Sequence, residues 1–80
     1  MMTRLEVLSH LSKEDVRMIR LCEASIEDQQ LAQEEFGPEY EKSFGKVKCL
    51  MCEMIEVLVE RSFGKKKTGR ALKALRRGRW

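Results

Sequence analysis

Cationic side chains are the most concentrated reactive groups in this sequence, and they lie at its C-terminal end. Residues 61–80 hold nine of the 16 Lys and Arg residues and no acid, which leaves 16 − 9 = 7 bases and all 13 acids in residues 1–60. Lysine and arginine neutralise phosphates and release condensed counterions, an interaction that needs no particular base sequence. We therefore predict a nucleic-acid-binding segment, for DNA or RNA, made of Lys65, Lys66, Lys67, Arg70, Lys73, Arg76, Arg77, Arg79 and Trp80.

Other interpretations of the same segment stay open. Its charge can instead fold back onto the chain's own carboxylates, or meet an acidic protein or a membrane surface through Leu72, Leu75 and Trp80. Trp80 can stack on an unpaired base or pack as an apolar anchor against the body of the protein. These alternatives differ in whether the cations remain available to a partner.

Acidic side chains gather in the middle of the chain. Residues 21–41 contain seven Asp or Glu residues and neither Lys nor Arg. Such a stretch is usually a solvated helix face, but it also suits docking of a basic protein. The first functional hypothesis is thus a nucleic-acid-binding regulator or accessory factor. The alternative is a protein-interaction module, an adaptor or inhibitor that uses the acidic surface.

Cysteine spacing raises, and then weakens, the case for a metal or redox site. Cys49 and Cys52 form a Cys-x-x-Cys pair, but structural zinc needs four ligands, and only Cys22 and His10 remain. A redox pair usually sits at a helix N-terminus, whereas these two thiols lie within an apolar helical pattern. We predict that both are small buried hydrophobes, and we expect neither a metal nor a cofactor.

Catalysis has little support in the residue pattern. The chain has one histidine, no Gly-x-Ser-x-Gly turn and no phosphate-cradling glycine loop. Adjacent acids such as Glu34 and Glu35 point to different sides of a helix, whereas acid–base catalysis needs carboxylates that converge. We predict a protein without enzymatic activity.

The elements that position these groups are helical. Thr3 and Ser12 each precede an acid by three residues, which predicts helices over about 4–10 and from Lys13. Ser25 is followed by a similar signal, so the second helix either breaks there or continues; the steps between Val16, Ile19, Cys22 and Ile26 favour near-continuity. The pair Gly37-Pro38 predicts the next boundary, followed by a helix over about 39–62.

After Gly64, the three lysines 65–67 are expected to form a basic connector, and Thr68 to cap a final helix over about 69–77, with Gly78 at its end. Ala71, Leu72, Ala74 and Leu75 would dock this helix on the body. The order of elements over 57–77 partly resembles a helix-turn-helix, but Glu60 and Lys65 fall where that motif needs a small and an apolar residue. The likeness is weak.

The predicted fold class is all-α: a small helical hairpin or bundle of three to four helices with a short basic C-terminal helix. We expect one domain, with an acidic body over 1–64 and the basic segment over 65–80. The heptad spacing of Phe44, Val47, Met51, Met54 and Leu58, widened by Leu50, Ile55 and Val57, suggests a homodimer paired through residues 44–58.

The cellular compartment is predicted from what the sequence contains. Three cysteines are an odd number and too few for a disulfide framework, and no apolar run resembles a signal peptide or a membrane span. We therefore expect a protein of the cytoplasm.

Overall fold

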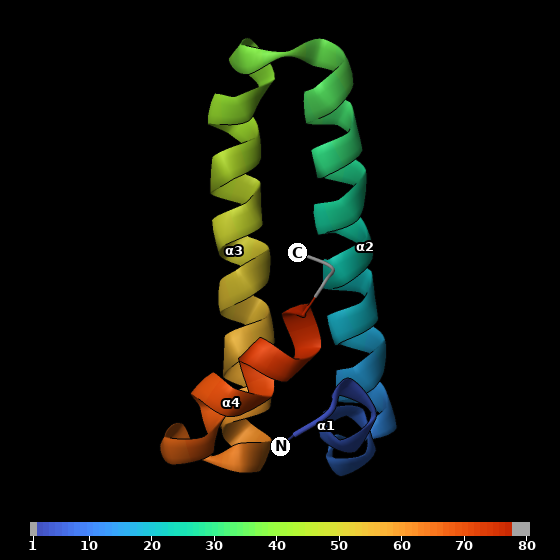
Figure 1. Cartoon of the computed structure of the whole chain (residues 1–80), viewed down its shortest axis with the longest axis vertical. Coiled ribbons are helices and arrows are strands. Elements are labelled where there is room, and N and C mark those ends of the chain that lie inside the picture. Colours follow the sequence, from blue (N-terminus) through green and yellow to red (C-terminus); the bar gives the residue numbers. More distant parts are fainter. Residues whose placement is uncertain (1, 78–80) are drawn as a thin grey trace.

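Two long antiparallel helices form a hairpin, and two short helices cover its open end (Figure 1). The computed structural model describes residues 2–77, with side-chain detail for all of these except 38–44. The helices are α1 (Arg4–His10), α2 (Lys13–Phe36), α3 (Pro38–Phe63) and α4 (Lys65–Arg76), and no strand occurs among the described residues. The all-α prediction is confirmed. None of these helices, within that range, is both long enough and apolar enough to cross a bilayer.

Side-chain caps set the start of the first two helices. The Thr3 hydroxyl accepts a hydrogen bond from the Glu6 backbone N–H at 3.2 Å, and the Ser12 hydroxyl accepts one from the Asp15 N–H at 3.1 Å. Each cap satisfies a donor that the first helical turn leaves without a partner. The predicted starts of α1 and α2 are therefore confirmed, and α2 continues through Ser25 without a break.

Single glycines make both sharp changes of direction. Gly37 joins α2 to α3 at φ 83° and ψ −163°, and Gly64 joins α3 to α4 at φ 78° and ψ 164°. This combination of angles is essentially restricted to glycine, because a Cβ atom would clash with the backbone. One residue is enough for each turn, so no longer connector is needed.

The predicted start of the last helix is wrong for this reason. α4 begins at Lys65, directly after Gly64, so Lys65, Lys66 and Lys67 form its first turn instead of a connector. Thr68 is not a cap: it is buried, and its hydroxyl donates a hydrogen bond to the Gly64 carbonyl at 2.7 Å. Gly78, the predicted end, lies outside the described residues.

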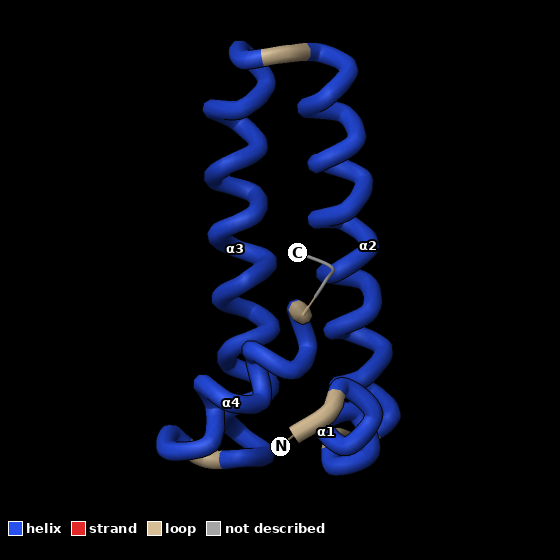
Figure 2. The backbone as a smooth tube through the Cα atoms, in the orientation of Figure 1, coloured by secondary structure: helices blue, strands red, loops and turns tan. Residues whose placement is uncertain are grey.

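The core lies at the open end of the hairpin, where all four helices contribute. Figure 2 shows α4 folding back from the end of α3 toward the space between α2 and α3. The buried apolar residues are Val7, Leu11, Ile19, Cys22, Ile26, Ile55, Val59, Ala71, Ala74 and Leu75. The predicted docking of α4 through its alanines and leucines is confirmed, with Leu72 half-buried at the edge.

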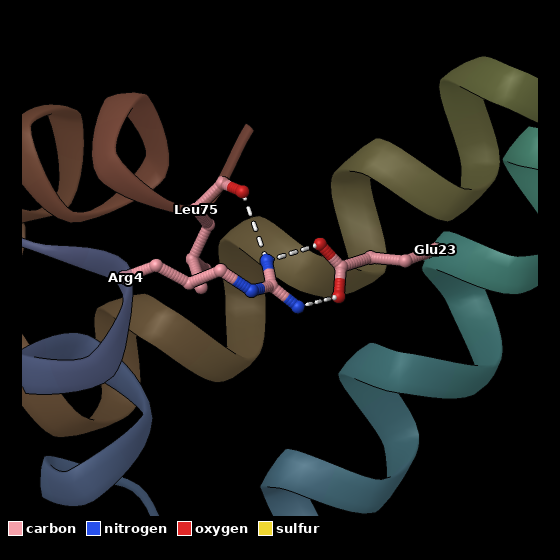
Figure 3. A network of polar contacts seen from close by, with 3 residues as sticks. All are labelled: Arg4, Glu23 and Leu75. Atoms are coloured by element: carbon pink, nitrogen blue, oxygen red, sulfur yellow. Dashed lines mark hydrogen bonds and ion pairs between the residues drawn. The ribbon is translucent and has the colours of Figure 1, made fainter. Parts of the chain in front are cut away.

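A polar network fastens α4 to the rest of the molecule (Figure 3). The Arg4 guanidinium donates to both carboxylate oxygens of Glu23, at 2.6 and 2.7 Å, and to the Leu75 carbonyl at 2.9 Å. Its hydrogen bond to Glu23 raises the pKa of Arg4, against the opposing effect of partial burial. The same guanidinium thus joins α1, α2 and the last turn of α4, which we call the Arg4 network.

Candidate nucleic-acid interface

The helix α4 has one buried side and one cationic side. Its buried residues are Thr68, Ala71, Ala74 and Leu75. The exposed residues between 65 and 77 are Lys65, Lys66, Lys67, Gly69, Arg70, Lys73, Arg76 and Arg77. Every exposed side chain in this segment is therefore cationic, and Gly69 is the one exposed residue without a side chain. We call these seven cations the α4 basic face.

A groove runs between α4 and the start of α1. It has a volume of about 560 Å³ and is lined by Lys67, Arg70, Lys73 and Arg77 together with Met2, Glu6 and Ala74. From Lys67 to Arg77 is a distance of ten residue steps, or about 15 Å along the helix at about 1.5 Å per step. Since one strand of duplex DNA places a phosphate every 3.4 Å or so along its axis, this row is long enough for about four phosphates.

Carboxylates of the chain leave most of this face uncompensated. In the part of the chain that the structure describes, ion pairs join Arg4 to Glu23 and Arg61 to Asp15. Neither pair involves the α4 basic face. Six of its seven members form no ion pair with a described carboxylate: Lys65, Lys66, Lys67, Arg70, Lys73 and Arg76. The alternative in which the chain neutralises its own basic segment therefore has no support at these six side chains.

Acidic side chains occur at both ends of the hairpin: α1, the start of α2 and the end of α3 carry acids beside α4, and a further group lies on α2 toward the α2–α3 turn. Asp28, Glu34 and Glu35 are exposed on α2 beyond Ile26, the last buried residue of that helix. Figure 1 shows α4 against the last turns of α3, at the end of the hairpin opposite the α2–α3 turn, in a molecule whose longest extent is 37 Å. The side chains of Glu39 and Glu41 lie outside the described set. The charge division of the sequence is therefore only in part a separation in space, since Glu6 lines the same groove as the cations of α4.

A second group of cations was missed by the sequence analysis. Lys13, Arg17 and Arg20 are exposed on one side of α2, where they line a shallow groove with Val16 and Leu21. They belong to the end of the hairpin that also carries α1 and α4. Counting charge over residues 1–60 as one block concealed them, although their steps of four and three residues already indicated a shared helix face.

Two of the predicted interface residues cannot be placed. Arg79 and Trp80 lie outside the described residues. Of the other seven predicted residues, six lie on α4 and Arg77 follows its last turn.

The three cysteines differ in their burial. Cys22 is buried and Cys52 half-buried, but Cys49 is exposed, so the prediction that both members of the Cys-x-x-Cys pair are buried is wrong for Cys49. A step of three residues corresponds to about 300° around the helix axis, so the Cys49 and Cys52 side chains point about 60° apart. Cys49 therefore lies outside the α2–α3 contact. Burial raises the pKa of the Cys22 and Cys52 thiols, so both favour the neutral form. Among described residues, no three His, Cys, Asp or Glu side chains converge to hold a metal ion.

The partial likeness to a helix-turn-helix does not extend to the turn. That motif joins its helices through three or four residues, whereas Gly64 alone separates α3 from α4. The structure instead defines a helical hairpin with an amphipathic helix folded back across its open end.

Comparisons with protein-family models, with curated proteins and with solved structures find no match to this chain.

Proposed function

We propose that this chain is a non-enzymatic nucleic-acid-binding protein, a regulator or accessory factor, that contacts phosphates through the α4 basic face. One observation carries the proposal: between residues 65 and 77 every exposed side chain is Lys or Arg. A helix that only needed solubility would be expected to mix both signs of charge. Seven cations of one sign on one helix repel each other, and a polyanion relieves that repulsion.

The way α4 is held supports the same proposal. Ala71, Ala74 and Leu75 are buried in the core, and Arg4 donates a hydrogen bond to the Leu75 carbonyl. The helix is therefore ordered before any ligand arrives, so binding loses less conformational entropy than it would with a disordered tail. If about five cations contact phosphates, log affinity for duplex DNA should fall with log salt at a slope of about −4.5.

The composition of the face favours contacts with the backbone over recognition of bases. Asparagine and glutamine, which pair with adenine in the major groove, are missing from its exposed positions. Lysine and arginine can pair with guanine but mostly bind phosphates, which position a protein without specifying sequence. We therefore expect binding that tolerates many sequences.

A matched pair of lysine substitutions tests the proposal. Lys73 lies on the α4 basic face, whereas Lys46 is an exposed lysine of α3 outside it. Lys73→Gln should weaken binding to a labelled duplex and reduce the magnitude of the salt slope by about 0.9. Lys46→Gln removes the same net charge and should change both quantities less. Equal effects of the two variants, or no effect of either, would contradict a localised interface.

Substitution is a better test here than truncation. Removing the chain beyond residue 63 would also remove Thr68, Ala71, Ala74 and Leu75 from the core. Loss of binding by such a fragment would then report unfolding as readily as loss of cations. Glutamine at an exposed position of α4 removes charge and leaves the buried side of the helix intact.

The alternative function uses the exposed acidic side chains of α2 beyond Ile26. Exposure of Asp28, Glu34 and Glu35 away from α4 would suit a basic partner protein. This alternative predicts that Lys73→Gln has no effect on partner binding and that Asp28→Asn with Glu34→Gln abolishes it.

A further inference from the structure

An apolar groove opens on the surface of the hairpin between α2 and α3. It has a volume of about 480 Å³, and its lining is Met18 of α2 together with Leu50, Met51, Glu53, Met54, Val57 and Leu58 of α3. Leu50 and Val57 are 57% and 58% exposed, and Met54 is 40% exposed. Contiguous exposed apolar side chains of this size are typical of a surface that another chain covers.

This groove does not belong to the α4 side of the molecule. Ile55 and Val59 are the residues of α3 that enter the core with α4. At about 100° per residue, Ile55 lies about 100° and Val59 about 140° round α3 from Met54. A partner could therefore cover Met54 and its neighbours and leave the α4 basic face accessible.

The charges beside the groove fit a second copy of this chain. Lys46, Glu53 and Glu60 follow each other at intervals of seven residues, so they lie in one row along α3, next to the exposed stripe Leu50–Met54–Val57. Lys46 and Glu60 are of opposite charge and equally distant from Glu53. Two antiparallel copies of α3 related by a two-fold axis at Glu53 would set each Lys46 beside the Glu60 of the other copy. A two-fold interface requires this kind of self-complementary surface.

We propose that two copies of this chain associate through this groove, with α3 antiparallel to α3 of the second copy and the two-fold axis at Glu53. Met54 and Val57 of each copy pack against the stripe of the other, and two Lys46–Glu60 pairs form at the ends. The two Glu53 carboxylates meet near the axis, where they repel each other. This inference does not depend on the proposed function.

The size of the surface sets the strength of the association. From Lys46 to Glu60, α3 is about 21 Å long, and with α2 beside it the contact is about 20 Å wide. Its footprint of about 400 Å² per copy, or about 800 Å² in total, lies below the range of about 1,200–2,000 Å² for stable specific interfaces and corresponds to a weak, transient complex. The dimer should therefore form and dissociate within a micromolar concentration series. It would carry two α4 basic faces, one toward each end.

Sedimentation equilibrium of the full chain, without nucleic acid and over a concentration series, tests this inference. The mass should rise from 9.4 kDa toward twice that value as concentration increases. Met54→Lys should weaken association at least tenfold, and Leu31→Lys should leave it unchanged. Leu31 is a matched control because it is 65% exposed but lies about 140° round α2 from Met18. Helical content measured by circular dichroism establishes that each variant is folded.

Charge substitutions test the geometry independently of the apolar stripe. Glu53→Gln should tighten the dimer about two- to fivefold, since an exposed charge pair is worth at most about 1 kcal/mol. Lys46→Glu should weaken it by a similar factor, and adding Glu60→Lys should restore it. A monomer at all concentrations, an equal effect of Leu31→Lys, or a failure of the double charge swap to restore association would each overturn the proposal.

Discussion

Replacing Arg4 by methionine should remove a large part of the protein's stability. The substitution takes two charge-assisted hydrogen bonds from Glu23, whose side chain is 3% exposed, and the donor from the Leu75 carbonyl. Breaking a buried ion pair by removing one partner costs about 3–5 kcal/mol. The Arg4 side chain is 23% exposed, so water offsets part of this cost, and we expect a loss of about 3 kcal/mol.

The expected cost of Arg4→Met is large compared with the total free energy of unfolding. At about 0.05–0.15 kcal/mol per residue, an 80-residue chain is stable by about 4–12 kcal/mol. Urea denaturation followed by circular dichroism would measure the change in the free energy of unfolding. Thermal unfolding should show a fall in Tm of about 12 °C or more, given about 4–8 °C per kcal/mol for a domain of this size.

Two companion variants test whether the Arg4 network is the cause. Glu23→Met alone should cost less than Arg4→Met, because the long Arg4 side chain can turn toward water while a buried carboxylate cannot. The double variant Arg4→Met with Glu23→Met should recover most of the loss, since apolar side chains of similar volume often replace a buried pair at little cost.

The surface pair Arg61–Asp15 serves as the control. Its atoms are 3.2 Å apart, but the Arg61 side chain is 64% exposed, so Arg61→Met should cost less than about 1 kcal/mol. The reasoning is refuted if Arg4→Met costs no more than Arg61→Met, or if the costs of Arg4→Met and Glu23→Met simply add in the double variant.

Three further predictions concern the turns, the thiols and the pH dependence of stability. Gly64→Ala should cost about 1–3 kcal/mol in urea denaturation because of its backbone angles, whereas Gly69→Ala, in the exposed helix α4, should gain up to about 1 kcal/mol. A thiol-reactive disulfide reagent should modify Cys49 first and Cys22 only on unfolding, as mass spectrometry of the labelled peptides would report; rapid labelling of Cys22 would contradict its burial. Because the pKa of Cys22 is raised above 9.0 in the folded state, unfolding releases a proton at alkaline pH, and stability should fall as pH rises above 9.0. Cys22→Ala should reduce that slope, and an unchanged slope would assign it to other groups.

Local signals predicted most of the fold. Thr3 and Ser12 are caps that a sequence displays directly, and Gly37-Pro38 marks a boundary because glycine ends a helix and proline can begin one. The buried residues Ile19, Cys22 and Ile26 follow from helical spacing alone. The start of α4 was missed because three successive lysines at a helix N-terminus oppose the helix dipole. Here the docking of the buried side of α4, a tertiary effect, prevails over that local preference.

The residues of the candidate site could be predicted from the sequence, but the contacts that hold α4 in place could not. The amphipathic pattern after Gly64 placed the cations of α4 on one exposed side. The Arg4 network joins residues 19 and 71 positions apart in the sequence, and no local pattern pairs them. Lys13, Arg17 and Arg20 were visible as a helical row, yet their place at the same end of the hairpin as α4 follows only from the tertiary fold.

The salt dependence of nucleic-acid binding by the full chain tests the central claim most directly. Fluorescence anisotropy of a labelled duplex, between about 50 and 300 mM salt, should give a slope of log affinity against log salt of about −4.5 if five phosphates are neutralised. Triple substitution of Lys66, Arg70 and Lys73 by Gln should reduce the magnitude of that slope by about 2.7. Failure of the full chain to bind at about 50 mM salt, where phosphate contacts are strong, would contradict the assignment of the α4 basic face to nucleic acid.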